Sequence, residues 1–262
     1  MDFTNLLNQV KQKQPITISD VWAQGRTVFG GVSTAMLYAA MRTEVESKRV
    51  LRSMNTSFVG PLKVGIPVIL EVEVLRVGRS VTQVVARAIQ EKQVAIVSQA
   101  SFGMDRESRI TVEANITHQL VEPEKGFFIK YQEGVTPPFL KHFDLSLCLG
   151  EAPFSNSSGH DLAGWMRFAN TVEETTDAHL IAAIDVWPAT ILQMFDEVAP
   201  ASSLSWNLEF IHPHSPMKAD SWFAYEASTR QAAAGYAHTE ANIWNQDGEL
   251  IAISRQAVVA YQ

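Results

Sequence analysis

One acidic residue stands out as a group that could do chemistry. Asp185 lies between Ile184 and Val186, in a stretch that is otherwise apolar and reads as a helix. Burying a carboxylate without partners is costly, so this side chain should either find hydrogen bonds or mark a site, where it could serve as a general base. The structural alternative is an aspartate on a narrow solvent-facing stripe, or a cap for the turn ahead of Pro188.

The other reactive side chains form no comparable pattern. Residues 31–35 resemble a nucleophile elbow around Ser33, but the alternating strands and helices of an α/β-hydrolase are missing. Of the seven histidines only His212 and His214 form a close pair, and no third metal ligand follows from spacing. The single cysteine, Cys148, excludes an intramolecular disulfide and a zinc site of several thiolates. No Walker or Rossmann glycine loop occurs, so neither a metal nor a cofactor is expected.

The composition is that of a globular chain. Of its 262 residues 46% are hydrophobic and 19% are charged, which argues against disorder. A net charge of -7 argues against a strongly basic nucleic-acid binder. No apolar run approaches the ~18 residues that span a bilayer, and the N-terminus lacks a basic region followed by an apolar one. We therefore expect a cytoplasmic protein that binds something small, with neither membrane nor nucleic acid as a partner.

The first hundred residues predict one helix followed by an antiparallel sheet. Residues 32–41 are rich in Ala, Met and Leu, which predicts a helix buried on most sides. Alternating segments separated by Gly and Pro predict strands. These strands are expected at residues 16–21, 50–59, 67–77, 80–90 and 95–102. A buried helix with a run of strands is an α+β pattern.

The last hundred residues repeat this order after a stretch of different character. Residues 117–159 are rich in Pro and Gly, which predicts a linker with short local structure. Beyond it we expect a helix over 177–195 and strands at 162–168, 203–211, 222–229, 234–245 and 250–260. The chain is thus predicted to hold an N-terminal domain over 1–116 and a C-terminal domain over 160–262.

The two halves also match at individual positions. Three identical residues recur at one constant offset of 152: Asn55 with Asn207, Phe58 with Phe210, and Pro61 with Pro213. A repeat of this length indicates a duplicated domain. The first helix has no acidic residue between Phe29 and Met41, so the duplication predicts one active site per chain.

Short motifs run through both halves in a fixed order. In the first half they are Phe29-Gly30-Gly31, Tyr38-Ala39-Ala40, Phe58, residues 75–80, Ile89-Gln90 and Ala100-Ser101-Phe102. In the second half they are Asp185, Ser203, Phe210 with Pro213, and residues 246–250 running on to Gln256. With these motifs the chain resembles the acyl-CoA thioesterase II (TesB-like) family over nearly its whole length.

The resemblance implies a fold and an activity. The fold would be an α+β double hotdog, with two antiparallel sheets that each wrap a central helix and pack as a pseudo-dimer. The activity would be hydrolysis of an acyl-CoA thioester to a carboxylic acid and CoA, with Asp185, Ser203 and Gln256 as the catalytic set. The family's usual residue at the middle position is threonine, and the nearby Ser202 and Ser205 leave a shift of one or two residues open. A homo-oligomer is also implied.

These roles suggest a mechanism and an alternative to it. Asp185 would activate a water or attack the thioester carbonyl itself, while Ser203 and Gln256 hold the water or the carboxylate. Backbone N–H groups at Gly30 and Gly31 could polarise the thioester oxygen, or these substrate-binding glycines could only shape the turn. The alternative is a non-catalytic acyl-CoA or lipid binding protein, which has no use for three converging polar side chains. The sequence has no histidine a few residues after Asp185, which argues against hydratase chemistry.

Overall fold

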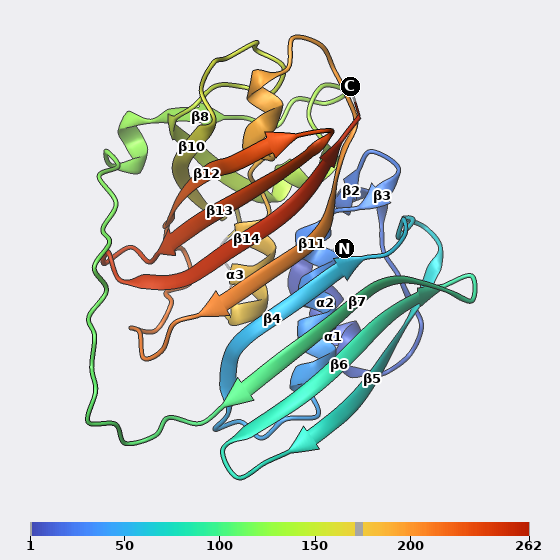
Figure 1. Cartoon of the computed structure of the whole chain (residues 1–262). Coiled ribbons are helices and arrows are strands. Elements are labelled where there is room, and N and C mark those ends of the chain that lie inside the picture. The colour runs from blue at the N-terminus through green and yellow to red at the C-terminus, as the bar shows by residue number, and fades with distance from the viewer. Residues whose placement is uncertain (1, 171–174, 262) are drawn as a thin grey trace. The chain divides into compact units, whose positions relative to one another are not determined.

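The computed structural model describes residues 2–170 and 175–261 (Figure 1). Its internal contacts divide the chain into two units, which are described separately. Unit 1 comprises Met1–Glu113, Tyr131–Lys141 and Thr175–Ala182. Unit 2 comprises Ala114–Lys130, His142–Glu174 and Ala183–Gln262.

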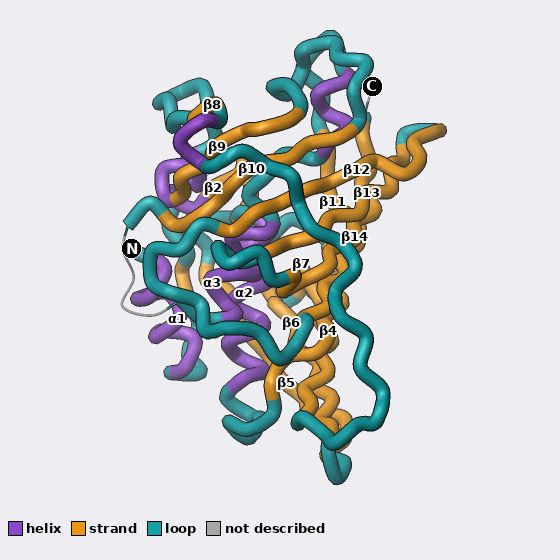
Figure 2. Tube along the Cα trace, turned by 90° about the vertical axis from the view of Figure 1, so that its left-hand side faces the viewer, coloured by secondary structure: helices purple, strands orange, loops and turns teal. Residues whose placement is uncertain are grey.

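Unit 1 is an antiparallel sheet with helices on one side, as Figure 2 shows. Its strands lie in the order β1 (Ile16–Thr17), β5 (Pro67–Val77), β6 (Val81–Gln90), β7 (Gln93–Gly103) and β4 (Val50–Phe58). A short ribbon of β2 (Ala23–Gln24) and β3 (Thr27–Val28) precedes helix α2 (Gly30–Arg42). Helix α2 is buried from Gly31 to Met41 and packs on β5, β6 and β7. The predicted apolar helix and the four long strands are thus confirmed.

A first helix, α1 (Phe3–Lys11), was not predicted. The Asp2 side chain caps it by accepting a hydrogen bond from the Asn5 N–H at 2.7 Å. The apolar side chains of the helix recur at helical spacing and are buried: Phe3, Leu6, Leu7 and Val10. Both signals are local, so the sequence did contain the information that predicts this helix.

Unit 2 is also built on an antiparallel sheet. Its strands lie in the order β11 (Ala201–Phe210), β14 (Leu250–Ala260), β13 (Tyr236–Trp244), β12 (Phe223–Ala233), β10 (Asp161–Phe168), β9 (Phe143–Leu149) and β8 (Phe127–Ile129). The 3-10 helix η4 (Thr190–Met194) packs on β12. The strands expected in the last hundred residues are present, with bounds shifted by a few residues.

The Pro- and Gly-rich stretch over 117–159 contains two of these strands, β8 and β9. The beginning of this stretch, together with Ile116 just before it, is hydrogen-bonded to the sheet of unit 2 by two tryptophans. The Trp165 indole N–H donates to the Val121 carbonyl at 2.7 Å, and the Trp244 indole N–H donates to the Ile116 carbonyl at 3.3 Å. Buried indole N–H groups need acceptors, so these bonds fix the path of the stretch.

The predicted helix over 177–195 is wrong in its second half. Helix α3 spans only Asp177–Ile184, and its end tightens with a hydrogen bond from the Val186 N–H to the Ala183 carbonyl. Pro188 explains the break, because proline disfavours helical backbone at the residue before it and has no N–H to donate. Asp185 therefore lies in the turn after the helix and not within the helix.

The two units repeat one strand arrangement. The order β5-β6-β7-β4 in unit 1 corresponds to β12-β13-β14-β11 in unit 2, with every pair antiparallel. The irregularities repeat as well: the pairing of β4 shifts between Leu51 and Ser53, and that of β11 shifts between Ser203 and Ser205. Matching bulges at positions 152 residues apart support the duplication predicted from sequence.

Candidate active site

The structure brings two of the predicted catalytic residues into direct contact. The Gln256 Nε2 atom on β14 donates a hydrogen bond to Asp185 Oδ1 at 2.8 Å, across 71 positions of sequence. Both side chains are half-buried. The contact lies within unit 2, between the turn after α3 and the sheet. A half-buried carboxylate held by an amide donor is a fixed proton acceptor.

Strand register explains how Gln256 reaches Asp185. Its direct partners are Trp206 on β11 and Thr239 on β13. Neighbouring positions on β14 alternate, with Ser254 and Val258 buried and Arg255 exposed. Gln256 therefore shares the inner face of the sheet with residues of the core, and its polar end is directed toward the turn that carries Asp185.

A pair of stacked aromatic side chains includes Tyr225, which interacts electrostatically with Asp185. The rings of Trp187 and Tyr225 are stacked with centroids 6.1 Å apart, and both residues are buried. Burial raises the pKa of the Tyr225 phenol, and the negative charge of Asp185 raises it further. Tyr225 thus stays protonated and close to the carboxylate. No sequence pattern pointed to Tyr225, whereas Trp187 follows Asp185 by only two positions.

A glycine makes room for this aromatic pair. Gly164 on β10 pairs with Tyr225, and a Cβ atom there would lie 2.7 Å from Trp187 Cη2. The indole Nε1 of Trp187 is buried and has no hydrogen-bond partner among the described residues. The Trp187 ring therefore packs directly against β10, close in sequence to the turn that carries Asp185.

Ser203 is placed by a bulge. It pairs with Val258, while Ser205 pairs with Ala257, so Leu204 is the extra residue of the bulged strand. The bulge puts Ser203 on the same face as Trp206 and Gln256, and it leaves Leu204 42% exposed. Within the described part of the chain, no hydrogen bond joins the Ser203 side chain to Asp185 or Gln256.

The predicted substrate-binding glycines begin helix α2 in unit 1. A Cβ atom on Gly31 would lie 2.6 Å from the Ala182 backbone oxygen and 2.7 Å from the Phe29 ring. Close packing of α2 against the end of α3 therefore requires a glycine at this position. A role of the Gly30 and Gly31 N–H groups toward a substrate oxygen stays a prediction.

The described residues include no group of three or more His, Cys, Asp or Glu side chains arranged to hold a metal ion. Residues 2–170 and 175–261 also contain no helix that is both long and apolar enough to cross a membrane. The arrangement offers the amide of Gln256 and the hydroxyl of Ser203 on one sheet face, with the carboxylate of Asp185 on the turn that meets the amide. This set suits activation of a water for attack on an acyl carbon.

Comparison with solved structures identifies the fold as a hotdog fold. The structure is similar to a hot dog fold protein of Alicyclobacillus acidocaldarius, with a TM-score of 0.82 and 20% identity over 95% of this chain and 92% of that one. It is also similar to the tesB protein of Mycobacterium avium subs. paratuberculosis, with a TM-score of 0.76 and 20% identity over 98% and 100% of the two chains.

Sequence comparison identifies the family. Residues 118–260 match the acyl-CoA thioesterase C-terminal domain, and residues 18–103 match the N-terminal domain. Acyl-CoA thioesterase 2 of Haemophilus influenzae is 23% identical over 88% of this chain and 86% of its own length. The chain belongs to the acyl-CoA thioesterase family and is a thioester hydrolase, which confirms the TesB-like resemblance.

Proposed function

We propose that the chain hydrolyses an acyl-CoA thioester with a water activated by Asp185. The Asp185–Gln256 hydrogen bond carries this proposal. Gln256 holds the carboxylate in one orientation, and Ser203 lies on the same sheet face to hold the water. The water oxygen attacks the acyl carbon as Asp185 takes its proton. The C–S bond then breaks, and the CoA thiolate leaves and is protonated.

Several features of the wider protein belong to the same proposal. The repeated strand order and the matching bulges support two hotdog domains, over residues 1–116 and 160–262, that form a pseudo-dimer with one active site. We also propose a homo-oligomer that works in the cytoplasm. Direct attack of Asp185 on the acyl carbon, with water releasing the acid afterwards, is the alternative chemical route.

A non-catalytic acyl-CoA or lipid binding protein is the second candidate function. Such a protein would need an apolar site but no oriented proton acceptor. The 2.8 Å bond between Gln256 Nε2 and Asp185 Oδ1 favours the enzyme, because it holds a half-buried carboxylate in a defined direction. A measurement of thiol release distinguishes the two functions, because a non-catalytic binding protein releases no thiol.

Release of CoA thiol from a panel of acyl-CoAs tests the proposed function. Gln256→Leu removes the donor to Asp185 at similar volume, and kcat should fall about 100-fold. The matched control is Gln99→Leu, because Gln99 is an exposed glutamine on β7, the corresponding strand of unit 1. Wild-type activity in the control and a large loss in Gln256→Leu are expected. No thiol release by wild type across the panel would favour the binding protein.

The three neighbouring serines give a second test. Ser203→Ala should lower kcat about tenfold, because only this hydroxyl shares the face of Gln256. Ser202→Ala and Ser205→Ala should leave kcat near the wild-type value, since strand alternation places Ser202, and the bulge places Ser205, on the opposite face. Steady-state kinetics of the three variants decide the assignment. A loss confined to Ser202→Ala or Ser205→Ala would move the hydroxyl role to that residue.

A further inference from the structure

A buried cluster of three threonine hydroxyls lies beside the Asp185–Gln256 pair. Thr190 Oγ1 on η4 is hydrogen-bonded to Thr229 Oγ1 on β12, and it lies 3.4 Å from Thr239 Oγ1 on β13. All three residues are at most 8% exposed. Register connects them to the site, because Thr229 pairs with Thr239 and Thr239 pairs with Gln256. A polar row thus crosses β12, β13 and β14.

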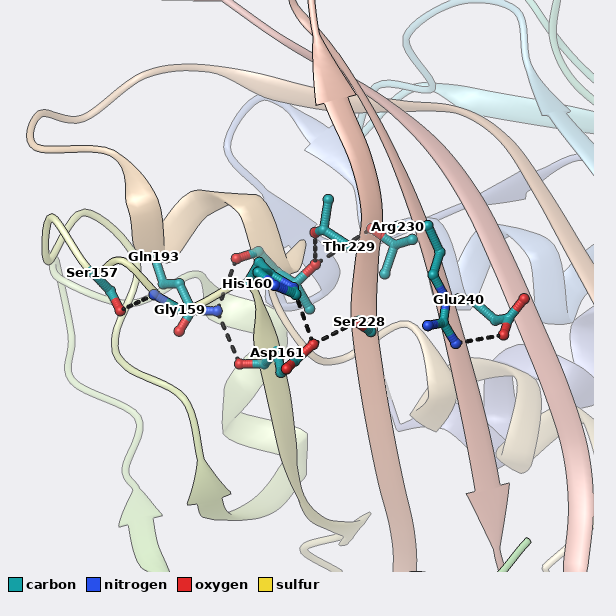
Figure 3. Close-up of polar contacts among 11 residues, drawn as sticks. Ser157, Gly159, His160, Asp161, Gln193, Ser228, Thr229, Arg230 and Glu240 are labelled. Carbon is teal, nitrogen blue, oxygen red and sulfur yellow. Dashed lines mark hydrogen bonds and ion pairs between the residues drawn. The ribbon is translucent and has the colours of Figure 1, made fainter.

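The same cluster fastens the segment that carries Asp185. Thr190 lies five positions beyond Asp185, and Gln193 lies three positions further along η4. Gln193 Nε2 donates to the Asp161 carbonyl at 3.0 Å and to the Thr190 carbonyl at 3.1 Å, and its Oε1 accepts from the Glu151 N–H at 2.9 Å. Figure 3 shows Thr229 and Gln193 among these contacts. The segment after α3 is therefore bonded to the sheet through side chains.

Unit 1 provides an internal comparison for this row. The corresponding strands have the same pairing, with Val74 opposite Val84 and Val84 opposite Ala100. The strand pairing is also irregular at the same place in both units. The register shifts directly after Val74 on β5 and directly after Thr229 on β12. The polar row of unit 2 thus has apolar counterparts in unit 1: Val74 for Thr229, Val84 for Thr239 and Ala100 for Gln256. Val84 and Ala100 are buried, whereas Val74 is 39% exposed.

The comparison of the two units shows whether folding of the sheet requires the threonine hydroxyls. The same strand arrangement forms in unit 1 with apolar side chains in the row, so the sheet itself does not require the threonine hydroxyls. Burying a hydroxyl in place of a methyl group gains little stability even when it is hydrogen-bonded. In unit 2 the hydroxyls instead join the sheet to η4, which carries Thr190 and continues the segment of Asp185. The same face of unit 2 carries Gln256, the hydrogen-bond donor to Asp185.

We propose that Thr190, Thr229 and Thr239 are positioning residues that hold the Asp185 turn against the sheet beside Gln256. The proposal rests on the proposed function and extends it, since none of the three side chains need touch the substrate. Thr190 links the Asp185 segment to two strands at once. Thr239, next to Gln256, fixes the position of the amide relative to that segment. Loss of one of these hydrogen bonds shifts the carboxylate of Asp185 without removing it.

Thr190→Val is the principal test, because it replaces a hydroxyl by a methyl group at nearly constant volume. The expected result is a fall in kcat of about tenfold with KM changed by less than about twofold, since the reacting groups are displaced while the binding surface is kept. Thr190→Ser keeps the hydroxyl and should restore kcat to within about threefold of wild type. Thr239→Val, which copies Val84 of unit 1, should act in the same direction.

The control is a matched hydroxyl pair elsewhere in the protein. Thr56 Oγ1 and Ser98 Oγ lie 2.9 Å apart, both buried, in unit 1. Thr56→Val should lower the Tm about as much as Thr190→Val but leave kcat unchanged. If Thr190→Val does not fold, Thr239→Val decides, and a kcat within about twofold of wild type overturns the proposal. Asp185→Asn is assayed in parallel: if it alone loses activity, the cluster fails and the proposed function stands.

Discussion

Asp185→Asn is expected to lower kcat for acyl-CoA hydrolysis by about a thousandfold while the protein keeps its fold. Asparagine has the same shape, and its Oδ1 atom can still accept the hydrogen bond from Gln256 Nε2 that Asp185 Oδ1 accepts at 2.8 Å. The variant therefore preserves the geometry and removes the proton acceptor. Steady-state thiol release with a matched Tm measurement tests this, because the Tm should stay close to that of wild type.

The same substitution at Asp177, at the start of α3, provides the control. Asp177 lies in the first turn of the helix and accepts a hydrogen bond from the Tyr38 hydroxyl at 2.9 Å. Asp177→Asn should change stability modestly and leave kcat near wild type. Activity of Asp185→Asn within a few-fold of wild type would contradict the role of Asp185 as the general base. It would also contradict direct attack by the carboxylate, because an amide can do neither.

The sequence predicted most of the strands because their signals are local. Alternating residues such as those of β5 end at turn residues, and the structure places strands there with shifts of a few positions. The helix over 177–195 was predicted too long because its apolar spacing continues past Asp185. Pro188 ends it, and that signal outweighs the spacing.

The site is less predictable because it depends on register. Asp185 and Gln256 are 71 positions apart, and only the pairing of β14 with β11 and β13 directs the amide to the carboxylate. Ser203 faces the site because of the extra residue Leu204, which no alternating pattern reveals. The family resemblance supplied these residues from sequence. The threonine cluster, in contrast, is visible only in the hydrogen bonds and strand register of the structure.

Gly164→Ala is expected to lower the free energy of unfolding by about 3 kcal/mol and the Tm by about 10 °C. A Cβ atom there would lie 2.4 Å from the Ser146 backbone oxygen on β9 and 2.7 Å from Trp187 Cη2. The backbone oxygen cannot retreat without loosening the β9–β10 pairing. The Trp187 ring would have to leave its stack on Tyr225, which moves the turn that carries Asp185.

Gly164→Ala is also expected to lower the activity of the folded protein. Because Trp187 follows Asp185 by two positions, kcat should fall even at temperatures where Gly164→Ala is fully folded. Gly159→Ala is the control, since its Cβ would meet only the flexible Ser157 side chain at 3.3 Å, and it should change stability by less than about 0.5 kcal/mol. Thermal unfolding and thiol release are measured on both variants. If Gly164→Ala were destabilised but kept its full kcat below its Tm, the Trp187 ring would not couple β10 to Asp185, and the aromatic pair would serve only to fill the core.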